Sequence, residues 1–248
     1  MLTEERYRII LQRLQISGIV KLQELVELLG TSESTVRRDL IDLEAQHLLK
    51  RVHGGASLLH RRSEEPGMEE KTFKNVQQKN AVGRAAAKQL RDGECIYLDA
   101  GTTTLAMIPF IEAQDITVVT NGLSHVEALV SKDIRAYLLG GMMKSHTKAV
   151  IGSIALQNMD NFRFDKAFIG TNGVNAEFGF TTPDPEEALI KRRARQLSER
   201  TYVLADSSKF GEVAFAKLFD LKEATIITDA IPERWKKPIL EKTKIIEG

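Results

Sequence analysis

The sequence has almost no cysteine and no long apolar run, and both absences exclude classes of protein. The single cysteine, Cys95, cannot form an intramolecular disulfide or supply a cysteine-rich metal site. It lies in the apolar run Glu94–Leu98, so we expect a buried thiol. No apolar run approaches the ~20 residues of a membrane span, and the polar stretch Thr3–Arg6 stands where a signal peptide would have an apolar core. We therefore expect a soluble, cytoplasmic protein.

A strong charge of one sign is also absent. The formal net charge is +1, so any affinity for nucleic acid must come from the local placement of arginine and lysine. Two nucleotide-binding patterns are missing, since no Gly-x-Gly-x-x-Gly follows a strand and no Gly-Lys-Thr/Ser phosphate loop occurs. A nucleotide-binding enzyme is therefore disfavoured. The length of 248 residues predicts one or two domains.

The first informative pattern is two short helices joined by a tight turn. An amphipathic helix ends at Gly30, and Ser32 is placed to cap a second helix, in which Val36, Leu40 and Leu43 share one side. Small hydroxyl residues followed by two arginines suit a helix in the DNA major groove. The candidate DNA-contacting residues of this motif are Ser32, Glu33, Ser34, Thr35, Arg37 and Arg38.

The flanks of this motif add a third helix and a wing. An apolar stripe from Tyr7 to Leu14 predicts an upstream helix that Gly18 ends, and Leu48–Ala56 predicts a short basic strand with a Gly-Gly turn. The alternative is a three-helix bundle with a solvated charged face, but the order of all these features favours a winged helix-turn-helix. The candidate DNA-contacting residues of the wing are Lys50, Arg51 and His53.

A domain boundary is predicted after the wing. Periodicity is lost between Leu58 and Gln78, where Pro66-Gly67 indicates a loop. Phe73 and Val76 are expected to dock this segment onto the body, and a helix resumes at about Gln78. We therefore predict a DNA-binding domain at 1–57, a linker at 58–77 and an α/β domain at 78–248.

Short apolar or β-branched runs alternate with helical patterns through the second domain. This alternation predicts a largely parallel sheet, with ligands bound beyond the carboxyl ends of its strands. The predicted strands are Cys95–Leu98, Ile116–Thr120, Ile134–Leu139, Lys166–Ile169, Thr201–Ala205 and Ala224–Thr228.

The loop after the first of these strands suits an anion such as phosphate. Asp99-Ala-Gly-Thr-Thr-Thr104 leads into a helix expected at Leu105, so that backbone N–H groups and threonine hydroxyls can act as donors. An ordinary capped turn is the alternative. The candidate effector-binding residues of this loop are Asp99, Gly101, Thr102, Thr103 and Thr104.

Small or polar residues follow the other strands at the same predicted edge. Asparagine amides can bind sugar hydroxyls, and Lys209 in the loop Asp206–Gly211 can supply a cation to phosphate. Five such loops at one edge favour a ligand site over a purely structural edge. The further candidates at these strand ends are Asn121, Gly140, Gly141, Gly170, Asn172 and Lys209.

The segment Phe178–Lys191 adds two charged candidates. A loop is expected to deliver Thr181 and Thr182, Pro185 starts a helix, and Glu187 and Lys191 then stand four residues apart. One interpretation is an exposed helical salt bridge worth only ~0.3–0.5 kcal/mol. The other is a carboxylate that accepts from sugar hydroxyls, with a lysine nearby.

Taken together, these motifs resemble the DeoR family of bacterial transcriptional regulators. The resemblance is carried by Thr31–Leu40, Leu49–Ala56 and the strand-end loops through the rest of the chain, and is greatest to the fructose-operon repressors. It implies a winged helix-turn-helix plus a C-terminal α/β sensor domain that shares a fold with ribose-5-phosphate isomerases. It also implies that Asp99–Thr104 is the phosphate loop, and that a second set lines the sugar-phosphate pocket: Gly170, Asn172, Glu187, Lys191 and Lys209.

These features are compatible with two functions. The leading hypothesis is a repressor of a sugar-utilisation operon controlled by a phosphorylated sugar, with fructose 1-phosphate as the first candidate. The alternative is a sugar-phosphate isomerase with an accessory domain, since Glu187 or Asp99 could serve as the base. An isomerase does not need a DNA-binding domain, so we expect no catalysis. The expected partners are operator DNA, the effector and a second or further copy of the chain (a dimer or tetramer), with no membrane, cofactor or metal.

Overall fold

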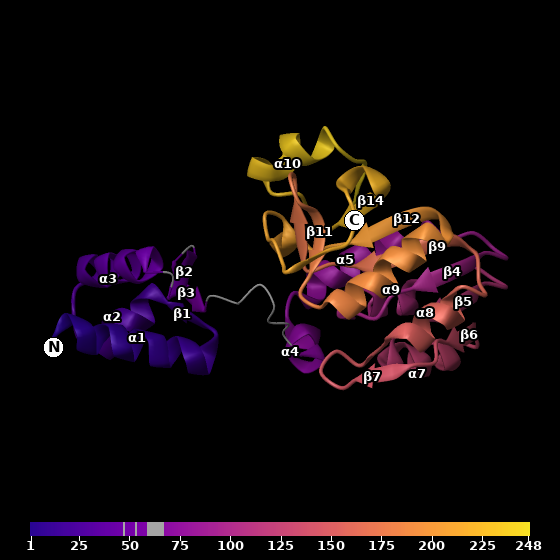
Figure 1. Cartoon of the computed structure of the whole chain (residues 1–248). Helices are drawn as coiled ribbons and strands as arrows, with labels where there is room; N and C mark the ends of the chain where they lie inside the picture. The colour runs from indigo at the N-terminus through magenta and orange to yellow at the C-terminus, as the bar shows by residue number, and fades with distance from the viewer. Residues whose placement is uncertain (47, 53, 59–66) are drawn as a thin grey trace. The chain divides into compact units, whose positions relative to one another are not determined.

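The computed structural model describes residues 1–46, 48–52, 54–58 and 67–248 (Figure 1). The chain divides into two compact units, Met1–Arg61 and Arg62–Gly248. Each unit has its own hydrophobic core, and each is considered by itself below. Among the described residues, no helix combines the length and apolar character needed to cross a membrane.

The first unit packs its helices on a small antiparallel sheet in the strand order β1-β3-β2. Its elements are α1 (Thr3–Ser17), β1 (Ile19–Lys21), α2 (Leu22–Leu29), α3 (Glu33–Ala45), β2 (Leu49–Val52) and β3 (Gly55–Leu58). Val36, Leu40 and Leu43 of α3 are buried in one core with Ile10 and Leu14 of α1. The predicted amphipathic stripes are therefore confirmed, and the fold is a winged helix-turn-helix.

Two glycines of the first unit have a clear structural reason. Gly30 follows α2 in the left-handed conformation (φ 57°, ψ 35°), which ends the helix as predicted. A side chain at Gly55 would lie 2.1 Å from the carbonyl oxygen of Val20, so only glycine lets β3 approach β1 this closely. The turn between α2 and α3 and the pairing of β3 with β1 depend on these two positions.

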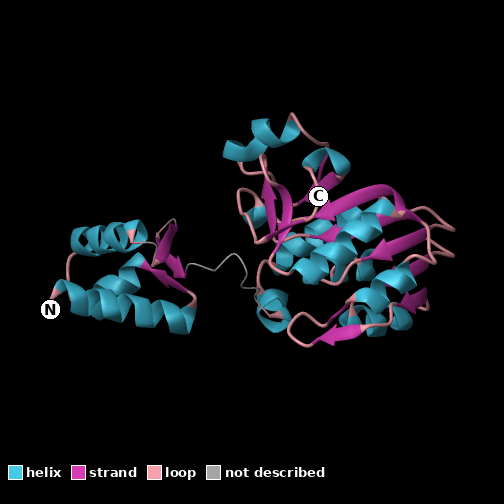
Figure 2. Ribbon diagram, in the orientation of Figure 1, coloured by secondary structure: helices cyan, strands magenta, loops and turns pink. Residues whose placement is uncertain are grey.

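The second unit is built around a seven-stranded sheet in which every neighbouring pair of strands is parallel (Figure 2). The order is β15-β14-β12-β9-β4-β5-β6. These strands are β4 (Cys95–Leu98), β5 (Thr117–Thr120), β6 (Arg135–Leu138), β9 (Phe164–Gly170), β12 (Ser198–Leu204), β14 (Thr225–Thr228) and β15 (Ile245–Glu247). The predicted parallel α/β fold is confirmed.

Helices and short segments connect and cover these strands. The helices are α4 (Met68–Phe73), α5 (Val76–Ala87), α6 (Thr102–Leu105), α7 (Leu123–Ser131), α8 (Ser153–Met159), α9 (Pro185–Gln196) and α10 (Glu233–Leu240), with 3-10 turns η1 (Ile108–Phe110), η2 (Ser207–Lys209) and η3 (Leu221–Glu223). Two small antiparallel sheets lie outside the main one. They consist of β7 (Met142–Lys144) with β8 (Ala149–Ile151), and of β10 (Gly173–Asn175), β11 (Gly179–Thr182) and β13 (Ala216–Lys217).

The strand order places a switch point between β4 and β9. The chain runs outward from β4 through β5 to β6, and then returns to β9 and continues outward on the other side. In such sheets the crevice at the switch point, beyond the carboxyl ends of the strands, is the usual ligand site. The loops that begin at Asp99 and at Gly170 therefore face each other across it.

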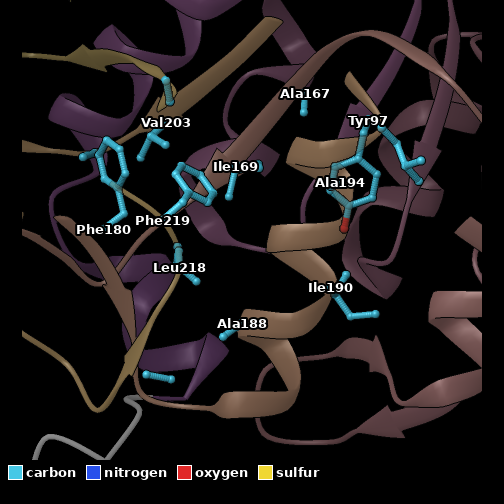
Figure 3. Packing of buried hydrophobic residues seen from close by; sticks show 14 of the residues in the cluster. Tyr97, Ala167, Ile169, Phe180, Ala188, Ile190, Ala194, Val203, Leu218 and Phe219 are labelled. Atoms are coloured by element: carbon cyan, nitrogen blue, oxygen red, sulfur yellow. The ribbon is translucent and has the colours of Figure 1, made fainter. Parts of the chain in front are cut away.

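The two faces of the sheet carry separate cores. On one face, side chains such as Val203 and Ile169 pack with Ala188, Ile190 and Ala194 of α9 (Figure 3). On the other face, a second cluster joins the sheet to α5, including Ile96, Leu98, Phe168 and Leu204 with Val82 of the helix. The central strands β4, β9, β12 and β14 are largely buried on both faces, which holds the loops at their carboxyl ends on a rigid base, whereas the edge strand β6 is exposed.

The structure corrects four predictions. Cys95 is exposed, because it is the first residue of β4 and only the following residues of that strand are buried. Thr181 and Thr182 lie in β11, not in a loop. The helix predicted from Gln78 begins at Val76, and α4 forms within the predicted linker.

The prediction that Phe73 and Val76 dock the linker onto the body is also wrong. Phe73 is 84% exposed and Val76 is 47% exposed, whereas Met68 is buried. The apolar residue that docks the segment is thus the first residue of α4.

Candidate functional site

Ser32 caps the N-terminus of α3 and orders the exposed first turn of this helix. The Ser32 hydroxyl accepts from the Thr35 N–H at 3.3 Å and lies 2.9 Å from the Ser34 hydroxyl. Ser32, Glu33 and Ser34 are exposed, and Thr35 is half-buried. The cap therefore fixes the first turn of the helix, and the hydroxyls of Ser32 and Ser34 remain accessible to a partner.

The two predicted arginines of α3 are both exposed. Arg37 forms an ion pair with Glu33 one turn earlier, at 2.6 Å, and both side chains are more than half exposed. Such a pair is weak and can be exchanged for a stronger anionic partner such as phosphate. Arg38 stands beside it on the same exposed surface.

The wing strand is tied to the same helix. Glu44 of α3 accepts from the backbone N–H of Arg51 at 2.8 Å and from its guanidinium at 2.6 Å, and these bonds lower the pKa of the Glu44 carboxyl. Lys50 and Arg51 are exposed on β2. His53, the third predicted wing residue, lies outside the described residues.

One structural residue beneath α3 was missed from the sequence. Asp39 is buried and accepts two hydrogen bonds from the Arg6 guanidinium of α1, at 2.6 and 2.8 Å. This bidentate pair fixes the angle of the recognition helix from below. The available signal was a carboxylate placed three residues after Val36, on the apolar side of the helix.

In the second unit, Asp99 lies at the centre of the switch point. Its buried carboxylate forms an ion pair with Lys191 of α9 and accepts from the Gly170 N–H at 2.9 Å. Burial raises the pKa of the Asp99 carboxyl, while Lys191 and the Gly170 N–H oppose the rise. Three predicted candidates from distant parts of the chain are thus brought together.

The loop from Ala100 to Thr104 is held by groups beneath it. The Asn121 side chain accepts from the Ala100 N–H and from the Tyr97 hydroxyl, both at 2.8 Å, and donates to the Val150 carbonyl at 3.1 Å. The buried Thr104 hydroxyl donates to the Asp99 carbonyl at 2.6 Å. Asn121 and Thr104, two of the predicted effector contacts, therefore support the loop from beneath.

The remaining loop residues have a different environment. Gly101, Thr102 and Thr103 are half-buried. The Gly101 backbone is extended, and a methyl group there would meet only the Thr104 hydroxyl, at 3.4 Å. Neither backbone strain nor a protein neighbour requires glycine at this position. The absence of a side chain does, however, leave the backbone of the loop open to close approach by another molecule.

The helix after the loop is shorter than predicted. It begins at Thr102, not at Leu105, and comprises only four residues. The dipole of so short a helix is small. The donors that this loop can offer to an anion are therefore of two kinds. They are the backbone N–H groups of the first turn, which have no acceptor within the helix, and the hydroxyls of Thr102 and Thr103.

His125 supports this loop and was not predicted. Its Nε2 lies 3.2 Å from the Thr104 hydroxyl, and its buried Nδ1 has no hydrogen-bond partner in the described structure. A side chain at Gly122 would lie 2.3 Å from Nδ1, so glycine makes room for the ring. Burial lowers the pKa of His125 to about 3, which keeps the imidazole neutral.

Glu187 and Lys191 share one side of α9 but contact different segments. Glu187 is buried and accepts from the Lys144 ammonium at 3.0 Å and the Thr147 hydroxyl at 2.7 Å. Lys144 also pairs with Asp184, the residue that caps α9. The β7–β8 turn is thereby fastened to α9, beside the pair formed by Lys191 and Asp99.

The other strand-end candidates divide into two groups. Asn172 is half-buried, accepts from the Thr182 hydroxyl at 3.1 Å and lies two residues after Gly170, at the switch point. Gly140 and Gly141 instead face α8 and β8, since their nearest neighbours are Asn158, Ile151 and Val150. We therefore assign the two glycines to the packing of α8.

Lys209 belongs to a cluster that the sequence only partly indicated. It is half-buried, and its backbone N–H donates to the carbonyl of Asp206 at 3.0 Å. The buried Asp206 carboxylate accepts from the Asn75 amide at 3.1 Å. Lys79 is also buried close by, and this burial lowers the pKa of its ammonium to about 8. Asn75 and Lys79 gave no signal in the sequence, because they lie at the predicted linker boundary.

The described part of the chain contains no cluster of side chains suited to bind a metal ion. No group of three or more His, Cys, Asp or Glu side chains there is placed to hold a metal ion.

Sequence comparisons match both units. The profile of the DeoR-like helix-turn-helix domain matches residues 6–62, and that of the DeoR C terminal sensor domain matches residues 74–230. The chain is 51% identical over 246 residues to the uncharacterized HTH-type transcriptional regulator FruR of Bacillus subtilis (strain 168), covering 99% of this chain and 98% of the relative.

Two further comparisons concern a repressor and a solved structure. The chain is 35% identical to the lactose phosphotransferase system repressor of Staphylococcus epidermidis (strain ATCC 12228 / FDA PCI 1200), covering 86% of each chain. The structure of ribose 5-phosphate isomerase A from Methanocaldococcus jannaschii is similar with a TM-score of 0.42 and 18% identity, covering 55% of each chain.

Proposed function

The chain belongs to the DeoR family of transcriptional regulators, and we propose that it represses a sugar-utilisation operon until a phosphorylated sugar releases it from DNA. The winged helix-turn-helix contacts the operator, and the edge of the parallel sheet binds the effector. We expect the chain to act as a homo-oligomer, because two DNA-binding units raise affinity for a repeated operator.

The proposed DNA contacts follow from exposure and chemistry. Ser34, Arg37 and Arg38 are exposed on α3, while Lys50 and Arg51 are exposed on the wing. An arginine can donate two parallel hydrogen bonds to guanine or to phosphate, and lysines neutralise backbone charge. A nearly neutral chain can thereby bind DNA through one local cationic surface.

The observation that carries the effector proposal is the Gly101–Thr103 loop at the switch point between β4 and β9. The hydrogen-bond donors of this loop favour an anionic ligand. The space beside Gly101 is not filled by a protein side chain, so a ligand can approach the backbone there. Lys209 supplies a cation, and Asn172 lies at the end of the neighbouring strand. An anion site combined with polar strand ends fits a phosphorylated sugar better than a free sugar.

Fructose 1-phosphate is the first candidate effector. The most similar of the relatives described above carries the name FruR, and the motifs of this chain resemble those of fructose-operon repressors. Other hexose and pentose phosphates follow it as candidates.

The pairing of the carboxylates supports a sensor over an isomerase. Asp99 is engaged by Lys191 and Gly170, and Glu187 by Lys144 and Thr147. A general base must instead reach a substrate proton within hydrogen-bond distance. We expect the sugar phosphate to be bound without turnover.

A titration of a preformed operator complex tests the proposal. An operator duplex is first selected with the purified chain, and the complex is then titrated with fructose 1-phosphate, fructose and inorganic phosphate. Fructose 1-phosphate should release DNA at concentrations at least tenfold below those of the other two. Thr102→Val and Lys209→Ala should weaken this response, while Lys88→Ala, which removes an exposed lysine of the same unit, should not.

The proposal fails on either of two results. One is that fructose releases DNA as well as its phosphate ester does, and the other is that Thr102→Val and Lys209→Ala respond like the unchanged chain. A thermal-shift screen with phosphorylated sugars would show which ligand raises the melting temperature. Conversion of a sugar phosphate during the same incubation would favour the isomerase instead.

A further inference from the structure

Helix α4 and the residue Asn75, here called the strap, are fastened to the second unit at both ends. At the beginning of the helix, the Met68 N–H donates to the carbonyl of His146 in the β7–β8 turn at 3.0 Å. The Met68 side chain is buried, and a side chain at Gly67 would lie 3.0 Å from the His146 ring. The start of the strap is therefore packed closely against that turn.

The end of the helix is held by a buried lysine. The Lys79 ammonium donates to the carbonyl of Lys71 and, at 2.7 Å, to the carbonyl of Lys74. Carbonyls at the end of a helix have no partner within it, so Lys79 satisfies groups that would otherwise need water. This contact fixes the last turn of α4 to α5.

Asn75 makes the second contact at this end. Its backbone is left-handed (φ 53°, ψ 40°), and its amide donates to the Asp206 carboxylate at 3.1 Å and to the Ser208 hydroxyl at 3.3 Å. Asp206 and Ser208 belong to the loop that carries Lys209. The strap is thus bonded directly to a segment of the proposed effector site.

The other contacts of the strap lead to the same site. α4 packs against α6, which contains Thr102 and Thr103. The β7–β8 turn is bonded through Thr147 to Glu187 of α9. The strap therefore contacts segments on both sides of the switch point.

A sugar phosphate could engage both groups that hold Asn75, the Asp206 carboxylate and the Ser208 hydroxyl. The other oxygen of the Asp206 carboxylate is buried and has no hydrogen-bond partner among the described residues. An unsatisfied buried oxygen is costly, so a ligand hydroxyl that donates to Asp206 would be favoured. A phosphate drawn to Lys209 would accept from the Ser208 hydroxyl, which now donates to the same Asp206 oxygen that accepts from Asn75, and this exchange would loosen the hold on Asn75.

We infer that the strap is the element that couples the effector site to DNA binding: it is held by Asp206 in the operator-binding form and is detached when the effector engages the Asp206–Lys209 loop. Residues 59–66 join the strap covalently to the DNA-binding unit. The inference rests on the proposed function, because it assigns the regulation of the same site. A ligand that disfavours the attached strap must also disfavour operator binding, since the coupling is reciprocal.

Two variants separate coupling from binding. Asn75→Gly removes the amide and keeps the left-handed backbone, which glycine adopts readily. Lys79→Met keeps the aliphatic stem and removes the ammonium. Asn80→Ala, an exposed asparagine of α5, is the matched control. Melting followed by fluorescence of Trp235, the single tryptophan, reports that the second unit is folded.

The expected result is a repressor that is partly released without effector. Asn75→Gly and Lys79→Met should raise the operator Kd at least fivefold and reduce the effector-induced change in that Kd at least fivefold. Asn80→Ala should behave like the unchanged chain. In the full-length unchanged chain, fructose 1-phosphate should accelerate amide hydrogen exchange in α4 at least threefold.

The outcomes distinguish this inference from the proposed function. If no sugar phosphate binds, but Asn75→Gly and Lys79→Met still weaken operator binding, the effector assignment fails and the strap is supported. If fructose 1-phosphate binds and releases DNA while both variants keep the original operator Kd and response, the strap is wrong. Unchanged exchange in α4 on binding of fructose 1-phosphate would also overturn it.

Discussion

Glu33 and Arg37 of the recognition helix face outward in the first unit, whereas Asp99 and Lys191 at the switch point of the second unit are buried. The comparison is clearest for two ion pairs. Arg37 and Glu33 have side chains that are 61% and 56% exposed, while Lys191 and Asp99 are 5% and 1% exposed. The first pair remains available to a partner. The second is part of the architecture that a ligand would approach.

Solvent exposure determines how much each ion pair loses when one partner is removed. An exposed pair is screened and loses little when one partner leaves, whereas a buried charge without its partner remains unsolvated. A pair of opposite charges is therefore exchangeable on the surface of the first unit and fixed in the interior of the second. Substitutions that remove one partner of each pair test this contrast directly.

The largest effect is expected at the buried pair. Lys191→Met should reduce the free energy of unfolding of the second unit by ~3–5 kcal/mol, because it leaves the Asp99 carboxylate buried without its cation. Urea denaturation followed by Trp235 fluorescence measures this unit alone, since the chain has one tryptophan. Adding Asp99→Asn should restore part of the loss.

Lys88→Met provides the control, because it removes an exposed lysine from the same unit. A loss below ~1 kcal/mol in Lys191→Met, as is usual for surface pairs, would show that burial does not set the strength of this pair.

A second large effect should appear in acid, at His125. Its pKa is about 3 in the folded unit, below its ordinary value of 6.5, so the unfolded chain binds a proton that the folded unit does not. Stability should therefore fall as the pH falls from 6.5 towards 3. Between pH 7 and 4.5 this group should contribute a loss of ~2–3 kcal/mol.

The measurement compares urea denaturation of the unchanged chain and of His125→Leu at those two pH values. The leucine variant lacks the titrating group, so its stability should fall less by that amount. Equal losses in both proteins would mean that His125 is protonated without cost in the folded state.

An intermediate effect is expected on the exposed surface of α3. Arg38→Ala should weaken operator binding by ~1–3 kcal/mol. Arg37→Ala should cost less, because its guanidinium must first leave Glu33. Fluorescence anisotropy with the selected operator gives both values, with Arg8→Ala on α1 as the control for loss of one exposed positive charge. Operator affinity unchanged in both α3 variants would remove this helix from the interface.

The sequence predicted the first unit well because its signals are local. The cap at Ser32, the end of α2 at Gly30 and the apolar side of α3 depend on residues within a few positions of one another. Asp39 was missed because its partner, Arg6, is 33 residues away on another helix.

In the second unit, the sequence predicted the strands and the edge where polar residues gather, but not their pairing. The spacing of Glu187 and Lys191 allowed either a bond along the helix or contacts to a ligand, and the Lys191 ammonium instead reaches Asp99, 92 residues away. The sequence also did not indicate that Asn121, a predicted ligand contact, bonds to the backbone of Ala100 and supports the loop. Residue type and spacing cannot determine such pairings, because the pairings depend on which strands become neighbours.

The smallest effect is expected at Glu33, the exposed counterpart of Asp99. Glu33→Gln removes the partner of Arg37 but leaves both side chains in water, so it should change the free energy of unfolding of the first unit by no more than ~0.5 kcal/mol. Operator affinity should rise slightly, because the change removes a negative charge near DNA phosphates and frees the Arg37 guanidinium. Circular dichroism of helix melting and anisotropy at two salt concentrations measure the two quantities. A destabilisation as large as that of Lys191→Met would mean that exposure does not distinguish the two pairs.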